Sequence, residues 1–138
     1  MNKKIIIICI MLFTGADLFG FISFLKRKID KANAFFNRNE YDKAQEIYRE
    51  AETDDPENAK IHYNIGNTYY KKKLYEKAIE EYNKALSTDD PDFQAKIYYN
   101  LGNAFYKTSQ YDKAVLSYKK SLTIHPDDKS CKFNLELA

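Results

Sequence analysis

Two octapeptides of this 138-residue chain match each other position by position: residues 63–70 read YNIGNTYY and residues 99–106 read YNLGNAFY. Each is followed by a second shared stretch, which reads YEKAIEEY at residues 75–82 and YDKAVLSY at residues 111–118. An earlier copy of the second stretch, YDKAQEIY, occupies residues 41–48. The three copies are 34 and 36 residues apart, and this period predicts one structural unit repeated three times along the chain.

Apolar and small residues inside each unit recur at spacings of three and four, which is typical of amphipathic helices. Gly66 and Gly102 lie within these patterns. Glycine inside a helix costs about 1 kcal/mol relative to alanine, so we expect a partner helix to approach closely at both positions. The patterns predict a helix A at residues 26–37, 59–72 and 93–107 and a helix B at residues 41–53, 75–87 and 111–123.

Clusters of aspartate and proline separate the units, at residues 54–56, 89–91 and 126–128. Aspartate suits helix caps and proline suits helix boundaries. The spacing of calcium-binding loops, with their central glycine, is missing from all three clusters. We therefore interpret them as joints between units and predict no metal site.

The repeated unit resembles the tetratricopeptide repeat, a helix-turn-helix of about 34 residues. Unit two matches the family pattern at His62, Ile65, Gly66, Tyr69, Ala78, Tyr82 and Ala85, and unit three at Tyr98, Leu101, Gly102, Phe105, Ala114, Tyr118 and Pro126. Unit one is more divergent and matches at Ala32, Phe35, Ala44, Tyr48, Ala51 and Pro56. The resemblance implies an all-α, right-handed superhelical solenoid with units at residues 26–58, 59–92 and 93–126 and a partial capping helix at residues 127–138.

Composition and motifs exclude several functions. The formal net charge is only +2, so there is no overall basic field of the kind that binds nucleic acid. The two histidines, His62 and His125, have no cysteine, serine or carboxylate at catalytic spacing, and the sequence holds no phosphate-binding loop, CxxC or HExxH motif. We therefore predict a protein that is not an enzyme and that uses no cofactor.

The N-terminus predicts export. Lys3 and Lys4 precede an apolar stretch at residues 5–13 and small residues that end at Ala16, which is the pattern of a signal peptide at residues 1–16. The alternative is an uncleaved anchor at residues 1–25, because the apolar run continues far enough to span a bilayer, although an aspartate near its middle would cost about 2.5–3.5 kcal/mol. Either interpretation predicts a periplasmic or inner-membrane location.

Residues 17–25 follow the predicted cleavage site and are rich in phenylalanine. We expect Phe19, Phe21 and Phe24 to pack on the first repeat as an N-terminal cap or linker. The alternative is a segment that docks on a membrane surface or on a partner, helped by the cations at residues 26–28.

The A helices line the concave face in the tetratricopeptide family, which implies a groove along helix positions three, four and seven residues apart. In unit one these positions include Ile29 and Phe36. The candidate peptide-binding residues are Asn33, Lys60, Tyr63, Asn64, Asn67, Tyr70, Lys71, Lys96, Tyr99, Asn100, Asn103, Tyr106 and Lys107. Amides, aromatic rings and lysines suit an extended peptide. In the alternative interpretation, Asn64 and Asn100 only bond to neighbouring helices.

Some members of the family hold the terminal carboxylates of chaperone peptides with a set of lysine, asparagine and arginine side chains. Asn33, Asn64 and Lys96 match that set, but Ile29 stands in place of a lysine and Asn100 in place of an arginine. Arginine provides bidentate recognition that an amide does not. We therefore do not expect a carboxylate clamp.

A closer resemblance rests on residues 95–103, 126–128 and 133–138 together with the export segment. These stretches are similar to the tetratricopeptide components of bacterial aerotolerance (Bat) operons, which implies action with a von Willebrand A-domain membrane protein and a MoxR-type ATPase. The main hypothesis is an exported or membrane-associated adaptor that binds a segment of a partner protein on its concave face. The alternative is a self-associating structural scaffold, a homo-oligomer without a peptide groove.

Overall fold

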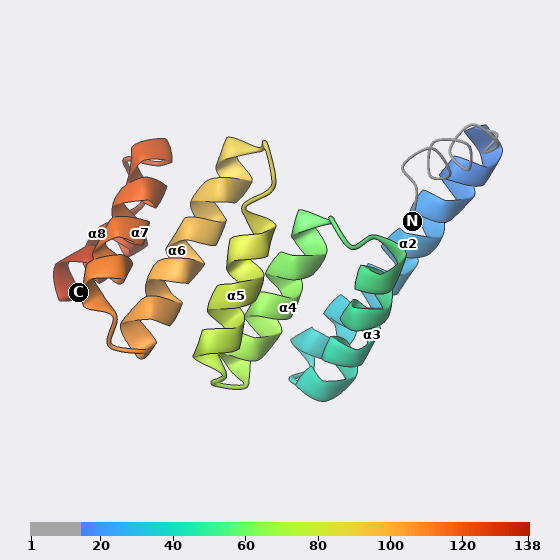
Figure 1. Cartoon of the computed structure of the whole chain (residues 1–138), viewed down its shortest axis with the longest axis horizontal. Helices are drawn as coiled ribbons and strands as arrows, with labels where there is room; N and C mark the ends of the chain where they lie inside the picture. The colour runs from blue at the N-terminus through green and yellow to red at the C-terminus, as the bar shows by residue number, and fades with distance from the viewer. Residues whose placement is uncertain (1–14) are drawn as a thin grey trace, which may run out of the picture.

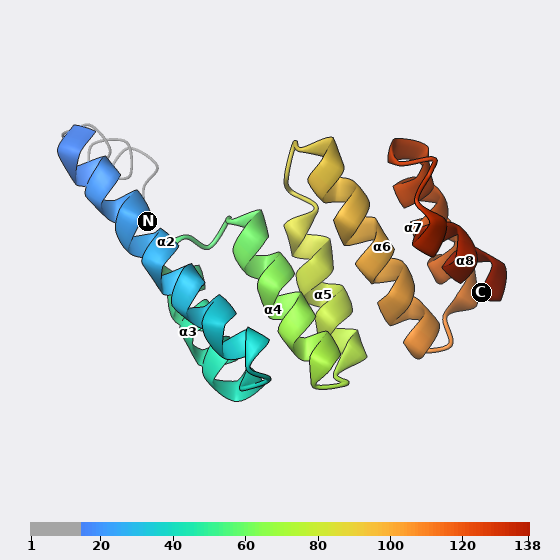
Figure 2. The ribbon, with the colours of Figure 1, turned by 180° about the vertical axis from the view of Figure 1, so that it is seen from behind.

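The computed structural model describes residues 15–138, and all secondary structure within them is helical. The helices are α2 (Gly15–Asn37), α3 (Tyr41–Asp54), α4 (Ala59–Lys71), α5 (Tyr75–Ala85), α6 (Pro91–Lys107), α7 (Tyr111–Ile124) and α8 (Lys129–Leu137). They follow one another in a row from one end of the molecule to the other (Figure 1), and the view from behind shows the same order (Figure 2). The predicted all-α solenoid is confirmed: α2 and α3, α4 and α5, and α6 and α7 form three units, and α8 follows them.

Polar side chains at the joints begin the next helix. The side chain of Asn58 accepts hydrogen bonds from the backbone N–H groups of α4, and Asp90 and Asp128 do the same for α6 and α8. Such caps contribute about 1 kcal/mol each. Pro91 lies in the first turn of α6, where proline is favoured because its missing N–H has no helical partner there. Helix α6 therefore begins two residues before the predicted start at Phe93.

The turn inside each unit has one conformation, used three times. In unit two, Lys73 has a φ of 62°, and the next residue, Leu74, donates its backbone N–H to the carbonyl of Tyr69. A left-handed residue followed by this long backbone bond is the Schellman ending of a helix. Asn39 in unit one and Ser109 in unit three have the same role, with φ values of 63° and 59°.

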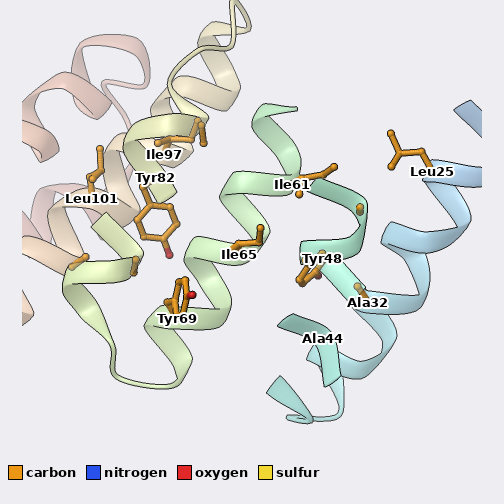
Figure 3. Close-up of a cluster of buried hydrophobic side chains, with 14 residues drawn as sticks. Leu25, Ala32, Ala44, Tyr48, Ile61, Ile65, Tyr69, Tyr82, Ile97 and Leu101 are labelled. Atoms are coloured by element: carbon orange, nitrogen blue, oxygen red, sulfur yellow. The ribbon is translucent and has the colours of Figure 1, made fainter. Parts of the chain in front are cut away.

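The cores of units two and three are each built around a tyrosine that lies against a glycine. A Cβ atom added to Gly66 would meet the ring of Tyr82 at 2.6 Å, and one added to Gly102 would meet the ring of Tyr118. The small residues of the B helices, Ala44 among them, are fully buried. Figure 3 shows this core between α2 and α6, with Tyr48, Tyr82, Ile61 and Ile65 among its labelled members. The predicted close approach of the A and B helices is confirmed.

Helix α2 extends further towards the N-terminus than the sequence predicts (Figure 1). Residues 1–14, which hold most of the predicted signal peptide and much of the alternative anchor, lie outside the described residues. Among the helices that are described, none has the length and apolar character that crossing a membrane would need.

The structure corrects the expectation that Phe19, Phe21 and Phe24 pack on the first repeat. Their side chains are exposed, and only Leu25, at the end of this segment, is buried. The physical reason is the length of the partner helix. Helix α3 ends at Asp54, whose carboxylate lies 2.5 Å from the ammonium group of Lys28, whereas α2 continues past this point.

The last helix, α8, packs on unit three. Cys131 is fully buried, with its Sγ 3.4 Å from the backbone oxygen of Tyr118, and Leu135 packs on the same cluster. Phe133 and Leu137 of the same helix are exposed. Helix α8 has the register of an A helix, and these two residues occupy positions that hold groove residues in the earlier units.

Candidate peptide-binding groove

Asparagine side chains join successive A helices along one face of the solenoid. Between units two and three, the Nδ2 group of Asn100 donates hydrogen bonds to Asn67 Oδ1 at 3.0 Å and to the Tyr63 hydroxyl oxygen at 3.1 Å. Asn67 Oδ1 also accepts a hydrogen bond from the hydroxyl of the core tyrosine Tyr82, at 2.8 Å. The Asn67 side chain thus bonds both to Asn100 of unit three and to the buried Tyr82 of its own unit.

The same bonds recur at the other joints. Asn134 of α8 donates to Asn103 Oδ1 at 2.9 Å and to the Tyr99 hydroxyl at 3.2 Å, and Tyr118 donates to Asn103. Between units one and two, Asn64 and Tyr48 both donate to Asn33 Oδ1. We call this series of three asparagine pairs, 33–64, 67–100 and 103–134, the asparagine ladder.

Each pair of the ladder uses only half of the hydrogen-bonding groups of its amides. The donating asparagines keep their Oδ1 atoms, and the accepting asparagines keep their Nδ2 groups, without a hydrogen bond to another described residue. All six side chains are partly exposed. Every pair therefore offers one acceptor and one donor, the same two groups that the backbone of an extended peptide presents.

Aromatic rings and hollows adjoin the ladder. One hollow is lined by Phe36, Tyr63, Asn67, Tyr70, Lys71, Tyr82, Asn100 and Asn103. The next is lined by Tyr70, Asn103, Tyr106, Lys107, Tyr118, Asn134 and Leu137. The third is lined by Tyr63, Ala95, Lys96, Tyr99, Asn100, Ser121, His125 and Asp128. The first hollow shares Tyr70 and Asn103 with the second, and it shares Tyr63 and Asn100 with the third. The three hollows therefore form one continuous surface.

The aromatic residues of this surface are held in place by edge-to-face contacts. Tyr70 contacts Tyr75 with a centroid distance of 5.2 Å and an interplanar angle of 67°, and Tyr106 contacts Tyr111 at 5.4 Å and 69°. Such pairs contribute about 0.5–1.5 kcal/mol beyond the burial of area. Burial raises the pKa of Tyr70, so its hydroxyl stays neutral at physiological pH.

Exposed lysines lie in and beside the groove. Lys60, Lys71, Lys96 and Lys107 are exposed, and none of them forms an ion pair with a described residue. Helix α4 contains no acidic residue and α6 contains only Asp92, whereas the acidic residues of units one and two gather on the B helices α3 and α5. Unpaired cations beside unused amide groups favour a ligand that carries carboxylates.

The structure brings together most of the predicted groove residues. The three hollows are lined by Tyr63, Asn67, Tyr70, Lys71, Lys96, Tyr99, Asn100, Asn103, Tyr106 and Lys107. Asn33 and Asn64 form the first pair of the ladder without lining a hollow, and Lys60 lies in the first turn of α4, outside the hollows. Asn64 and Asn100 do bond to neighbouring helices, as the alternative interpretation expects, but their Oδ1 atoms stay available. That these residues bind a peptide stays a prediction.

Sequence reasoning missed Asn134, which completes the ladder. Its signal was its position 34 residues after Asn100, the same spacing that separates unit one from unit two. The short length of the C-terminal segment led us to treat it as a cap only.

A second cluster of ionisable side chains lies away from the groove, at the joint between units one and two. His62 Nδ1 lies 2.9 Å from Glu81 Oε2 and 3.5 Å from Glu52 Oε1, and the three residues are close enough together to hold a metal ion. The atoms that could bind a metal already form hydrogen bonds within the protein. Arg49 donates to Glu52 at 2.6 Å and to Glu81 at 2.8 Å, and His62 Nε2 lies 2.8 Å from the carbonyl oxygen of Pro56. The cluster is therefore an ion network and does not fit a metal.

Glu81 is the buried centre of this network. Burial alone would raise the pKa of its carboxyl group, but hydrogen bonds from His62 and Arg49, the charge of Arg49 and a contact with Lys84 outweigh burial and lower the pKa. The Arg49 guanidinium also donates to the Tyr69 hydroxyl at 3.1 Å. The sequence placed His62 at a core-facing position but did not reveal its partners, because Glu52 and Glu81 have no equivalents in unit three.

Comparison with known proteins supports the repeat assignment. Models of the tetratricopeptide repeat match residues 29–93 and residues 95–128. Together these spans cover most of the chain, which therefore belongs to the tetratricopeptide repeat family. No curated protein matched the sequence.

Solved structures share the fold. The Arabidopsis OM64 TPR domain is 21% identical with a TM-score of 0.78, over 85% of this chain and 95% of that one. The N-terminal domain of stress-induced protein-1 from C. elegans is 25% identical with a TM-score of 0.75, over 85% and 96%. The second TPR domain of the human RPAP3 protein, solved in complex with the HSP70 peptide SGPTIEEVD, is 24% identical with a TM-score of 0.74, over 80% and 90%. The closer resemblance to the aerotolerance group gains no support from these comparisons.

Proposed function

We propose that this chain is a non-catalytic interaction module that binds an extended, acidic segment of a partner protein along its concave face. The observation that carries the proposal is the asparagine ladder, in which each pair keeps one free acceptor and one free donor. An extended backbone satisfies its polar groups by pairing with donors and acceptors of this kind. The tyrosines Tyr70 and Tyr106 add rigid apolar contact beside the ladder.

The acidic character of the ligand follows from the lysines. Lys71 and Lys107 line two adjoining hollows, and neither has an acidic partner among the described residues. Exposed charges of this kind raise the rate of association and select the sign of the ligand's charge. Their effect falls with salt, because the Debye length is about 8 Å at physiological ionic strength.

The manner of binding differs from a carboxylate clamp. The peptide in the human RPAP3 structure ends in the sequence EEVD. In this chain, however, Ile29 packs against the core, and the Nδ2 group of Asn100 already donates hydrogen bonds to Tyr63 and Asn67. Neither position supplies a cation. We therefore propose that the groove binds a segment inside the partner's chain and does not require a free C-terminus.

The module is proposed to act outside the cytoplasm, in the periplasm or at the inner membrane, with a von Willebrand A-domain membrane protein as its partner. The sequence of residues 1–25 supports this location. The alternative function, a self-associating scaffold, is favoured by the exposed Phe133 and Leu137 on the last helix.

A peptide-display selection against the full chain tests the groove. We expect the selected peptides to be rich in aspartate and glutamate and to bind without regard to a free C-terminus. Replacement of Lys71→Glu together with Lys107→Glu should weaken their binding at least tenfold, because two attractive charges become repulsive. Affinity is measured by fluorescence anisotropy at two salt concentrations.

The matched control is Lys119→Glu with Lys132→Glu, which makes the same charge change at exposed positions of α7 and α8 outside the hollows. Peptides that bind both double variants equally well would contradict the proposal. If no peptide binds and light scattering shows an oligomer, the scaffold is the better explanation.

A further inference from the structure

The N-terminal part of α2 carries an exposed apolar surface, in which Phe24 has the ammonium group of Lys28 at 4.8 Å from its ring centre. Leu18, Phe19, Phe21, Ile22 and Phe24, which we call the α2 overhang, have exposed fractions from 39% to 73%. Only Gly20 and Ser23 interrupt the apolar residues between positions 18 and 25. Contiguous exposed apolar groups of this size mark an interaction site on a folded protein.

The overhang is part of a rigid element. Helix α2 is one uninterrupted helix from Gly15 to Asn37, and its later residues Leu25 and Ala32 are buried in unit one. At 1.5 Å per residue, the overhang extends about 10 Å beyond Leu25. Whatever binds the overhang therefore also fixes the direction of the first repeat.

Unpaired cations follow the overhang directly. Lys26, Arg27 and Lys31 are exposed, and none of them forms an ion pair with a described residue, whereas the neighbouring Lys28 pairs with Asp54. Asp30 is the only acidic residue between positions 18 and 37. Apolar residues next to a cluster of unpaired cations complement the interface of an anionic bilayer, because the cations are attracted to the anionic headgroups.

We propose that the α2 overhang is a membrane-surface helix. The side chains of Phe19 and Ile22 and their apolar neighbours enter the boundary between headgroups and acyl chains, while Lys26, Arg27 and Lys31 contact anionic headgroups. A second copy of the chain fits the surface less well, because pairing of two overhangs brings two sets of these cations together. The inference goes beyond the proposed function, since it uses no residue of the groove.

The absence of tryptophan from the sequence makes a direct test available. The Phe19→Trp variant of the full chain places a single fluorophore in the overhang, and Phe133→Trp places one at a similarly exposed position on α8. With vesicles of phosphatidylglycerol and phosphatidylcholine, we expect a blue shift of emission for Phe19→Trp and none for Phe133→Trp. Equal shifts, or a shift in neither variant, would overturn the proposal.

Vesicle co-sedimentation then separates the contribution of the apolar side chains to membrane binding from that of the cations. The double variant Phe19→Ser with Ile22→Ser should bind anionic vesicles at least tenfold more weakly, whereas Leu116→Ser with Phe133→Ser, two similarly exposed positions far along the chain, should bind like the unchanged protein. Replacement of Lys26, Arg27 and Lys31 by glutamine should remove the preference for anionic over neutral vesicles.

Two results would assign the surface to another occupant. If Ile6→Ser with Ile7→Ser abolishes binding while the overhang variant retains it, the contact belongs to residues 1–14 and the proposal fails. If light scattering shows a dimer that the overhang variant converts to a monomer, and vesicles are not bound, the surface pairs two copies of the chain and the proposal also fails.

Discussion

At the scale of single residues, the contact between Gly66 and Tyr82 determines how closely the two helices of unit two approach. The ring lies where a Cβ atom would be, 2.6 Å from it. Ala32 occupies the equivalent position in unit one and is fully buried, so the fold accommodates a methyl group there when the surroundings are adjusted. In units two and three, the tyrosine ring lies so close to the A helix that only glycine fits without a shift of the ring.

The first prediction follows from this contact. Gly66→Ala should lower the free energy of unfolding by up to about 2 kcal/mol, because overpacking costs about 1–3 kcal/mol and the gain in helix propensity is only about 1 kcal/mol. Urea unfolding followed by circular dichroism measures the change. Gly20→Ala is the matched control: an added Cβ at Gly20 meets nothing within 4 Å, so stability should rise or stay the same. A stabilised Gly66→Ala variant would contradict the prediction, because it would show that the Tyr82 ring shifts away from the added methyl group at little cost in free energy.

At the scale of elements, the two joints between units are built differently. Between units one and two, Glu81 and His62 belong to a buried ion network. In unit three, Ser117 and Tyr98 stand at the equivalent positions, and Ser117 donates its hydroxyl to the backbone oxygen of Lys113 within its own helix. Among the described residues, the first joint therefore contains a buried ion network, and the equivalent positions of the second joint carry no charge.

The second prediction concerns the response of the first joint to acid. The folded protein lowers the pKa of Glu81 below the value of about 4.3 for an unfolded chain. The network therefore adds stability above about pH 4, and this stability is lost as pH falls through the folded pKa. Glu81→Gln should destabilise the protein by about 1–3 kcal/mol at pH 7, and the difference from the unchanged protein should shrink below pH 4.

Urea unfolding between pH 2.5 and pH 7 measures the difference. Ser117→Ala changes the equivalent position of the second joint, and its effect should be independent of pH in this range. A constant gap for Glu81→Gln at every pH would mean that the carboxylate charge contributes nothing to the first joint.

Sequence and structure agree where a residue's role recurs in every unit. The repeated small and aromatic residues predicted the helices, the close approach at Gly66 and the gathering of most candidate groove residues on one surface, since each of these positions recurs two or three times in the sequence. Apart from Asn134, the features that the sequence did not reveal occur once. The ion network joins Glu52, His62 and Glu81 across 29 residues without a repeat, and the length of α2 was hidden by apolar residues that also suit a signal peptide.

At the scale of the whole molecule, the three core tyrosines act together. Tyr48, Tyr82 and Tyr118 are each 1% exposed, and each donates its hydroxyl to an asparagine of the ladder. Burial raises the pKa of Tyr48 to about 12 and raises the pKa of Tyr82 and Tyr118 as well. Each unit thus keeps one proton that the unfolded chain loses near pH 10.

The third prediction is a steep loss of stability in alkali. Groups with a raised folded pKa contribute stability that is present below about pH 10 and lost as pH rises above it. Three such groups give a slope of about 4 kcal/mol per pH unit, and Tyr82→Phe should reduce this slope by about a third. Urea unfolding between pH 9 and pH 11.5 measures it. Tyr111→Phe, which removes an exposed tyrosine, should leave the slope unchanged, and equal slopes for both variants would contradict the prediction.

The hydrogen bonds between neighbouring units are unevenly distributed along the solenoid. Units one and two are tied on two sides, by Asn64 at the ladder and by Arg49, Gln45 and Lys72 elsewhere on the joint. Among the described hydrogen bonds, those between the helices of units two and three run only through Asn100. The first joint therefore has more polar links than the second, where the edge-to-face contact of Tyr63 with Phe93 also joins the units. We expect a ligand that lies across α4 and α6 to change the angle between units two and three more than the angle between units one and two.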